Sequence, residues 1–205
     1  MVDRKQIRNI RSDSGANLNQ IALTTVDSSI SAGSFEGFSW IRPHGKGSFM
    51  NSPALKAYCD SRVAAGESLL VVDLADCAGM DSTFMGTLAG TAARLSAIDG
   101  GRLHIAEPGE RNRRSLEDLG LDFLMDIDPP SAPWRGNIES IRDRLQPLHQ
   151  LPDLGRLQRT RHVLEAHQTL SGITPKNASG FAGVVGTLKE ELSKKERLAN
   201  EGGGA

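Results

Sequence analysis

The sequence predicts an α/β fold, a small sheet with helices packed on it, followed by a C-terminal all-helical extension. Between residues 35 and 130, short apolar runs typical of strands alternate with amphipathic patterns typical of helices. The strand pattern stops at DPPSAP, residues 128–133, and only helical patterns follow. We therefore expect one α/β domain over residues 35–130 and a helical extension over residues 131–199.

Both ends of the chain have compositions that favour disorder. Residues 1–34 are rich in Ser, Asn, Gly and Asp and bury too little apolar surface to fold alone. We expect a mobile N-terminal arm there, with one short strand near IALTTV, residues 21–26. The polar, glycine-rich end NEGGGA predicts a disordered tail over residues 200–205.

The first half of the domain predicts two strands and a helix. Residues 35–50, FEGFSWIRPHGKGSFM, indicate a pair of short strands with Pro43 at an edge or a bulge. Ser52 as N-cap and Pro53 at the first helical position begin a helix that Gly66 can close. Its apolar face consists of Leu55, Tyr58, Cys59 and Val63.

The second half of the domain continues the alternation. Residues 68–77, SLLVVDLADC, have the continuous Leu and Val run of a strand covered on both faces. A helix over residues 82–98 follows, and the glycines of DGG suit its C-terminal end. The remaining elements are a strand at 102–108, a polar helix at 110–121 and a last strand at 122–127.

The extension shows helical patterns alone. Residues 134–148 and 155–170 are two such segments, and a third helix begins with Thr174 as cap and Pro175 in its first turn. The third helix carries an apolar stripe of Phe181, Val184, Val185, Leu188 and Leu192. The extension therefore needs a surface to pack on, which is the α/β domain, a second copy or another protein.

Composition excludes several classes of function. The 24 Lys and Arg balance 25 Asp and Glu, so no overall field draws the chain to nucleic acid or to a membrane surface. Aromatic residues make up 4%, too few for the stacking platforms that hold single-stranded nucleic acid. No segment approaches the roughly 18 apolar residues of a membrane span, and the charged N-terminus lacks a secretion signal. We expect a globular cytoplasmic protein.

Motifs of metal, redox and nucleotide sites do not occur. Cys59 and Cys77 lie outside any CxxC spacing, and two thiols in this length suit a reducing compartment. His162 and His167 are five apart, and this spacing does not place two metal ligands on one helix face. The segment HGKGS at 44–48 has one residue between its glycines and is not a phosphate-binding loop.

Asp81, Ser82 and Thr83 stand where the apolar run meets the helix over residues 82–98. Asp81 or Ser82 can cap that helix. A nucleophilic serine does not fit, because MDSTF at 80–84 lacks the glycines of a G-x-S-x-G elbow. A phosphate in the first helical turn is stabilised by the helix dipole, and its charge beside Asp81 would repel a docked partner. A phosphorylation switch therefore explains the neighbouring polar residues better than a cap alone.

The segment LLVVDLADCAGMDSTFMGTL, residues 69–88, combines a strand ending in Asp with Asp-Ser-Thr at the start of a helix. It resembles the signature of the STAS domain, the family of bacterial anti-sigma-factor antagonists. GRLHIAEPGERNRRSLEDLGL, residues 101–121, is similar to the family's next strand and helix. The resemblance covers residues 36–130 and implies a STAS-like small mixed sheet with helices packed on it.

The resemblance implies a phospho-regulated partner switch without enzymatic activity. Ser82 would accept the phosphate, with Thr83 as a second candidate, and Asp81, Ser82, Thr83, Phe84 and Met85 would contact the partner. The unphosphorylated form would bind an anti-sigma factor or a related ATP-binding serine kinase. A metal-dependent serine phosphatase would restore that form. ATP belongs to the kinase, so we expect no cofactor in this chain.

The chain departs from the family pattern in two ways. Where the family has Gly-Leu-Gly after its Asp-Ser motif, this chain has Phe84, Met85 and Gly86. Phe84 either anchors a different partner or packs inward, and inward packing is favoured for a lone aromatic ring in a helix. The extension is a dimerisation element, a cover over the switch face or a second docking site.

Two other functions stay open. One is a scaffold or sensor that is not phosphorylated and assembles through its C-terminal helices, for example as a homodimer. The other is a nucleotide-binding STAS module.

Overall fold

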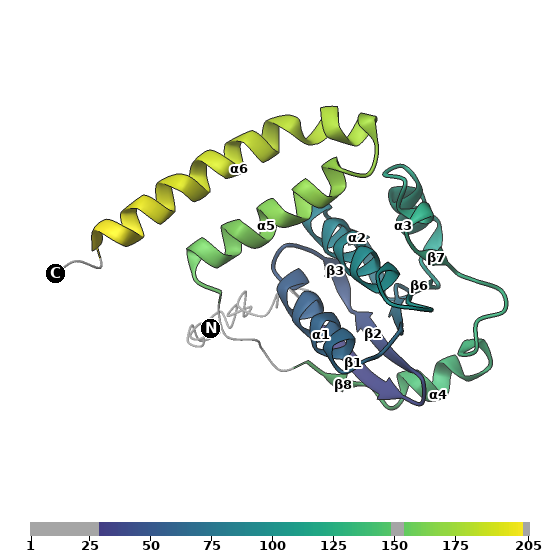
Figure 1. Ribbon diagram of the computed structural model, residues 1–205. Coiled ribbons are helices and arrows are strands. Elements are labelled where there is room, and N and C mark those ends of the chain that lie inside the picture. Colours follow the sequence, from purple (N-terminus) through teal and green to yellow (C-terminus); the bar gives the residue numbers. More distant parts are fainter. Residues whose placement is uncertain (1–28, 149–153, 203–205) are drawn as a thin grey trace, which may run out of the picture.

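The computed structural model describes residues 29–148 and 154–202 (Figure 1). Over these residues the chain is a mixed sheet with helices on both faces, and a long helical hairpin lies beside one helix layer. The α/β class and the C-terminal helical region are therefore confirmed. The predicted arm up to residue 28, the strand near residues 21–26 and the tail at 203–205 lie outside the described residues.

Within the described chain, six strands form the main sheet in the order β7-β6-β4-β2-β1-β8. Strand β1 runs antiparallel to β2 and β8, whereas β2, β4, β6 and β7 run parallel. Strands β3 and β5 form a separate parallel pair. The bounds are β1 Ile30–Phe35, β2 Phe38–Pro43, β3 Gly45–Gly47, β4 Leu69–Asp73, β5 Cys77–Met80, β6 Arg102–Ala106, β7 Asp126–Ile127 and β8 Gln146–Pro147.

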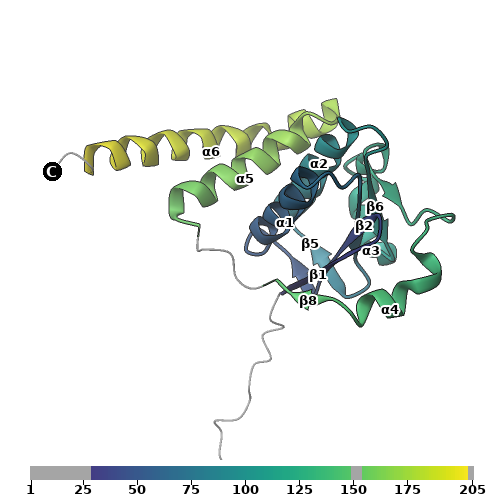
Figure 2. The ribbon, with the colours of Figure 1, turned by 60° about the horizontal axis from the view of Figure 1, so that its bottom comes forward.

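Helices α1 and α2 cover one face of the sheet, and α4 lies on the other (Figure 2). The first face holds the larger apolar core, which includes Leu55 of α1 and Leu88 of α2. On the second face, the Trp40 and Trp134 rings meet edge to face with centroids 5.2 Å apart. The helices are α1 Ser52–Ala64, α2 Ser82–Ser96, α3 Gly109–Glu117, α4 Ile138–Arg142, α5 Arg156–Ser171 and α6 Pro175–Gly202, with short 3-10 helices at Leu121–Phe123 and Arg135–Asn137.

Asp73 at the end of β4 is a fully buried carboxylate that joins the sheet to α4. Arg142 of α4 donates to it through Nε at 2.8 Å and through Nη2 at 3.0 Å. Trp40 Nε1 and the amide of Ala75 also donate to Asp73, at 3.3 and 3.0 Å. The bond to Asp73 raises the pKa of Arg142 above its usual value, so the guanidinium of Arg142 stays charged. A buried charge needs this degree of compensation to be tolerated.

The domain begins earlier and ends later than its predicted bounds of 35 and 130. Residues 30–34, expected in the mobile arm, form most of β1 and pair with β2 along its whole length. The strand is missed because ISAGSF is made of small and polar residues. Residues 131–148, expected in the extension, supply Trp134, α4 and the edge strand β8. Pro147 is compatible with β8 because an edge strand leaves backbone groups unpaired.

Several smaller expectations are corrected as well. Of the last predicted strand, 122–127, only Asp126–Ile127 is extended; the turn at Gly120, with φ of +71°, starts a 3-10 helix instead. Ser52 is the first residue of α1 rather than its N-cap, which is Asn51. Thr174 does cap α6, because its hydroxyl accepts the amide of Asn177 at 3.1 Å.

The extension packs on the α/β domain. Helix α5 lies along α2, and α6 turns back along the outer side of α5 (Figures 1 and 2). Helix α6 runs to Gly202, past the end predicted at residue 199. No helix in the described part of the chain is long and apolar enough to cross a membrane.

Replacing Arg142 by alanine tests the buried pair. Arg142→Ala leaves the Asp73 carboxylate buried with its main counter-charge removed, so we expect the free energy of unfolding to fall by about 3–5 kcal/mol. Arg144→Ala is the matched control, because Arg144 is exposed and lies over the Phe35 ring at 5.0 Å, a contact of about 1 kcal/mol or less. Chemical denaturation of both variants measures the difference, and equal losses would contradict the role given to Asp73.

Candidate functional site

The junction between β5 and α2 is organised by Asp81. Its backbone is extended, with φ of −89° and ψ of 170°, and its Oδ1 accepts the Phe84 amide at 2.9 Å, so Asp81 is the N-cap of α2. Its Oδ2 accepts the amide of Phe49 at 2.8 Å, which ties down the loop between β3 and α1. Its own amide donates to the carbonyl of Gly47 at 2.9 Å. One carboxylate thus fixes the starts of both helices on this face.

Ser82 is the first residue of α2 and is partly exposed. Its Oγ lies 2.9 Å from Nε2 of His167 on α5. The other ring nitrogen of His167, Nδ1, lies 2.8 Å from the carbonyl oxygen of Val163 and must carry a proton to donate there. In the neutral ring Nε2 is therefore the acceptor, and the Ser82 hydroxyl donates to it.

Three of the residues expected at the docking surface point inward. Thr83 is 4% exposed, Phe84 is fully buried and Met85 is 9% exposed. Phe84 packs so close to Gly47 that a Cβ there would lie 2.9 Å from its ring. The inward alternative for Phe84 is therefore confirmed, and the assignment of Phe84 and Met85 to partner contact is wrong because both belong to the core. Burial also removes Thr83 as an accessible phosphate acceptor.

Helix α5 approaches α2 at backbone distance. A Cβ built on Gly86 would lie 2.3 Å from the carbonyl oxygen and 2.9 Å from the Cα of Ala166. One turn further along α2, a Cβ on Gly90 would meet nothing nearer than 3.7 Å. Gly86, four residues after Ser82, therefore marks the place where the two helices touch.

A second serine and histidine pair lies at the start of α1. The Oγ of Ser52, the residue expected as N-cap, is 2.8 Å from Nε2 of buried His162. Burial lowers the pKa of His162 to about 4, and the positive charge of Lys56 acts in the same direction. His162 is thus neutral near pH 7. Despite their spacing of five, His162 and His167 both face the domain, and each contacts the first residue of a helix.

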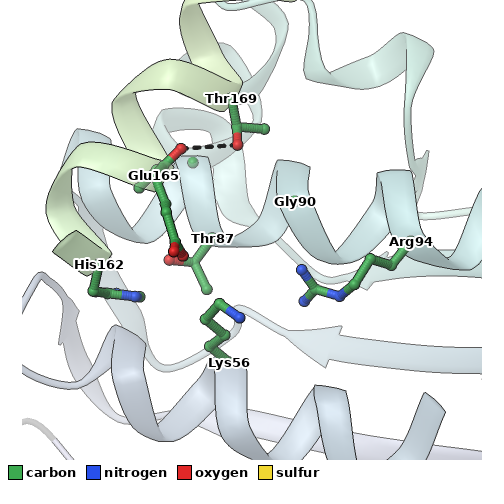
Figure 3. Close-up of a pocket in the computed structure, with 9 residues that line it drawn as sticks. Lys56, Thr87, Gly90, Arg94, His162, Glu165 and Thr169 are labelled. Carbon is green, nitrogen blue, oxygen red and sulfur yellow. Dashed lines mark hydrogen bonds between the residues drawn. The ribbon is translucent and has the colours of Figure 1, made fainter. Parts of the chain in front are cut away.

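A small cavity lies between α1, α2 and α5 beside this contact (Figure 3). Its volume is about 50 Å³, enough for bound water but far below a nucleotide. Labelled residues in Figure 3 include Lys56 and Arg94, both of which pair with Asp60, and Thr169, whose hydroxyl donates to the Glu165 carbonyl at 2.9 Å. A larger hollow of about 370 Å³ opens between α1 and α5, next to Arg161.

Ser82 has a histidine neighbour but lines neither of these two cavities. A serine near a histidine is the first requirement of nucleophilic catalysis. The two cavities just described, however, are lined by other residues than Ser82. In the described parts of the chain, no group of three or more His, Cys, Asp or Glu side chains is placed to hold a metal ion. Cys59 and Cys77 are buried free thiols, and burial raises the pKa of Cys59 to about 12.

Sequence reasoning missed His167 as a neighbour of Ser82. The two residues are 85 positions apart, and the histidine belongs to a helix whose packing partner was left open. The usable signal was Gly86, because a glycine inside a helix often marks a close approach of another backbone. Phe49 and Met50 were missed as exposed apolar residues beside Asp81; they are 43% and 61% exposed.

Known proteins share this fold. The family model of the STAS domain matches residues 29–132, a range that starts with β1 and ends just before Trp134. The chain is similar to a solved Thermotoga maritima protein, 19% identical over 54% of this chain and 92% of that chain, with a TM-score of 0.46. It is also similar to an anti-sigma factor antagonist from Mycobacterium paratuberculosis, 25% identical over 56% of this chain and 96% of that one, with a TM-score of 0.44.

A third solved structure is the Bacillus cell fate determinant SpoIIAA in its phosphorylated form. It is 19% identical over 55% of this chain and 97% of that chain, with a TM-score of 0.42. No curated protein matches the chain by sequence. Helices α4, α5 and α6 lie outside the family match.

The depressed pKa of His162 predicts a stability loss in acid. An unfolded histidine titrates near pH 6.5, so as the pH falls from about 6.5 to about 4 the unfolded chain takes up a proton that the folded chain does not. The stability that neutral His162 provides is fully present above about pH 6.5 and is lost as the pH falls toward about 4. We expect the free energy of unfolding to drop less in His162→Gln than in the parent chain between about pH 7.5 and about pH 5. Parallel pH dependences in chemical denaturation would contradict a neutral buried His162.

Proposed function

The chain belongs to the STAS domain family, and from this premise we propose that it is a partner-switching protein controlled by phosphorylation of Ser82. The observation that carries the proposal is the position of this hydroxyl: it is partly exposed, stands at the first residue of α2 and directly follows Asp81. Thr83 next to it is buried. Of the two hydroxyls in this motif, Ser82 is therefore the more exposed.

The helix start can carry the added phosphate without loss of the fold. Phosphoserine adds about −1.5 to −2 charges, and the positive end of the α2 dipole offsets part of them by about 0.3–1 kcal/mol. The neighbouring Asp81 carboxylate adds to the negative potential. A partner that docks here in the unphosphorylated state would then meet repulsion and a costly desolvation. The fold stays intact while the surface changes its charge.

The docking surface that we propose consists of Asp81, Ser82, Phe49 and Met50. Phe49 is held beside Asp81 by its amide, and both apolar side chains are exposed. Large apolar residues next to a charged group are suitable anchors for a partner. In this proposed docking surface, Phe49 and Met50 take the place of Phe84 and Met85, which belong to the core.

The partner in this proposal is an anti-sigma factor or a related ATP-binding serine kinase. The kinase supplies the ATP and phosphorylates Ser82, and a metal-dependent serine phosphatase removes the phosphate. The chain itself acts by binding and performs no catalysis.

A second function is favoured by the hydrogen bond between Ser82 and His167. A hydroxyl that holds α5 has a structural use without any phosphate. The chain would then be a scaffold or sensor of the same fold, assembling through its C-terminal helices.

Mapping the phosphate separates the two functions. We expect protein isolated from its native cells to carry a phosphate on the tryptic peptide Val63–Arg94, localised to Ser82 and varying with growth and stress. Fragmentation mass spectrometry distinguishes Ser82 from the other hydroxyls of that peptide. An unmodified peptide under every condition would contradict the switch and favour the scaffold.

Variants at Ser82 test the effect on binding. We expect Ser82→Asp to retain less of the partner captured from native cell extract than Ser82→Ala does, by roughly tenfold or about 1.4 kcal/mol, because of charge repulsion. Ser96→Asp is the matched control, since it adds the same charge at the exposed far end of α2. Equal capture by Ser82→Ala and Ser82→Asp, with both folded, would contradict charge control at this residue.

A further inference from the structure

Helix α5 lies along α2 (Figure 1), and its His167 contacts Ser82 at the start of α2. Contact at Gly86 brings the backbone of α5 against α2, so the surface next to Ser82 is shaped to receive another helix. Such a surface takes a helix with a small residue at the contact, as Ala166 is here. The occupant in this structure is a segment of the same chain.

Polar contacts hold α5 at both helix starts. His167 accepts from Ser82 and His162 contacts Ser52, each at less than 3 Å. Leu164 and Leu170 add buried apolar area, and Leu170 belongs to the larger apolar core. Interfaces between units of one chain commonly combine polar and apolar contacts in this way.

Helix α6 braces α5 from its outer side, so the two helices form a unit. The contacts between them include Lys195 Nζ to Thr160 Oγ1 at 2.7 Å, Arg161 to Glu196 at 2.8 Å, and the rings of His167 and Phe181 edge to face at 5.6 Å. The start of α6 is bound to the domain through Asn177 Nδ2, which donates to the Leu119 carbonyl at 2.9 Å. If α5 moves away from α2, α6 therefore moves with it.

We propose that α5 is an intramolecular competitor of the partner: it fills the helix-binding face of α2 beside Ser82, and the partner and kinase reach this face when α5 leaves. This inference rests on the proposed function of Ser82. The kind of partner that fits is a helix that lays its backbone against Gly86, as α5 does.

A phosphate on Ser82 would meet α5. The Oγ of Ser82 and Nε2 of His167 are 2.9 Å apart, so a phosphoryl group on the oxygen in its present position would overlap the imidazole. The modified serine would have to displace the imidazole. Phosphorylation therefore requires the open form and then maintains it.

The test opens the interface by adding one methyl group. In the full chain, Gly86→Ala places a Cβ against the Ala166 backbone, whereas the control Gly90→Ala places one in ordinary contact distance. Both variants are combined with Ser82→Cys, and the alkylation rate of the introduced thiol by N-ethylmaleimide is measured by peptide mapping. The native thiols at 59 and 77 are buried and are followed separately.

We expect the introduced thiol to react about tenfold faster with Gly86→Ala than with Gly90→Ala, and amide exchange of α5 to rise similarly. The amides of β4 report on the domain and should stay protected in both. Rates within about twofold of each other, with β4 protected, overturn the proposal.

A second variant acts from the other side of the interface, in case Gly86→Ala loses β4 protection. Ala166→Glu places a charge on α5 against Gly86, and Ala182→Glu on the exposed surface of α6 is its control. Faster alkylation of the introduced thiol with Ala166→Glu than with Ala182→Glu supports the role of α5 as a competitor. Equal alkylation rates overturn it.

The two proposals fail separately in these experiments. The alkylation assay needs no kinase, so a chain that is never phosphorylated in cells can still show release of α5. If Ser82 carries a phosphate in cells but the Gly86→Ala and Gly90→Ala variants are alkylated at equal rates, the proposed function is supported and the role of α5 as a competitor is contradicted.

Discussion

The carboxylate of Asp81 is the constraint on which this face of the molecule depends. It caps α2 through Phe84, holds the loop before α1 through Phe49, and its amide is bound to β3. The positions of Ser52 and Ser82 follow from these bonds, because each begins one of the two helices. Both hydroxyls are in turn the groups that α5 contacts. A capping residue thus defines the surface on which the C-terminal helices rest.

The other face of the sheet depends on chain beyond the family match. Arg142 of α4 and Trp134 complete the burial of Asp73 and Trp40, and both follow residue 132. Residues 133–147 are therefore part of the folded domain, and α5 and α6 form a further layer whose Leu170 joins the larger core. The predicted boundary near residue 130 reflected a change of pattern along the sequence, not a limit of packing.

Local pattern was sufficient for the central elements. The Leu and Val run of β4, the helix after Asp-Ser-Thr and the Thr-Pro start of α6 lie where predicted, because each depends on neighbouring residues. Strand β1 could not be predicted from small and polar residues that become a strand only by pairing with β2. The Ser82 environment was out of reach for a related reason: the contact with His167 joins distant polar residues and has no periodic signature.

The long sequence separation of the serine and histidine contacts has a consequence for synthesis. Ser52 and Ser82 precede their histidines by 110 and 85 residues. Because domains form from the N-terminus as the chain is made, at about 5–20 residues per second, the sheet domain is available some seconds before α5 and α6 are complete. Each newly made molecule thus passes through an uncovered form, and a factor acting on nascent chains meets Ser82 before the hairpin docks.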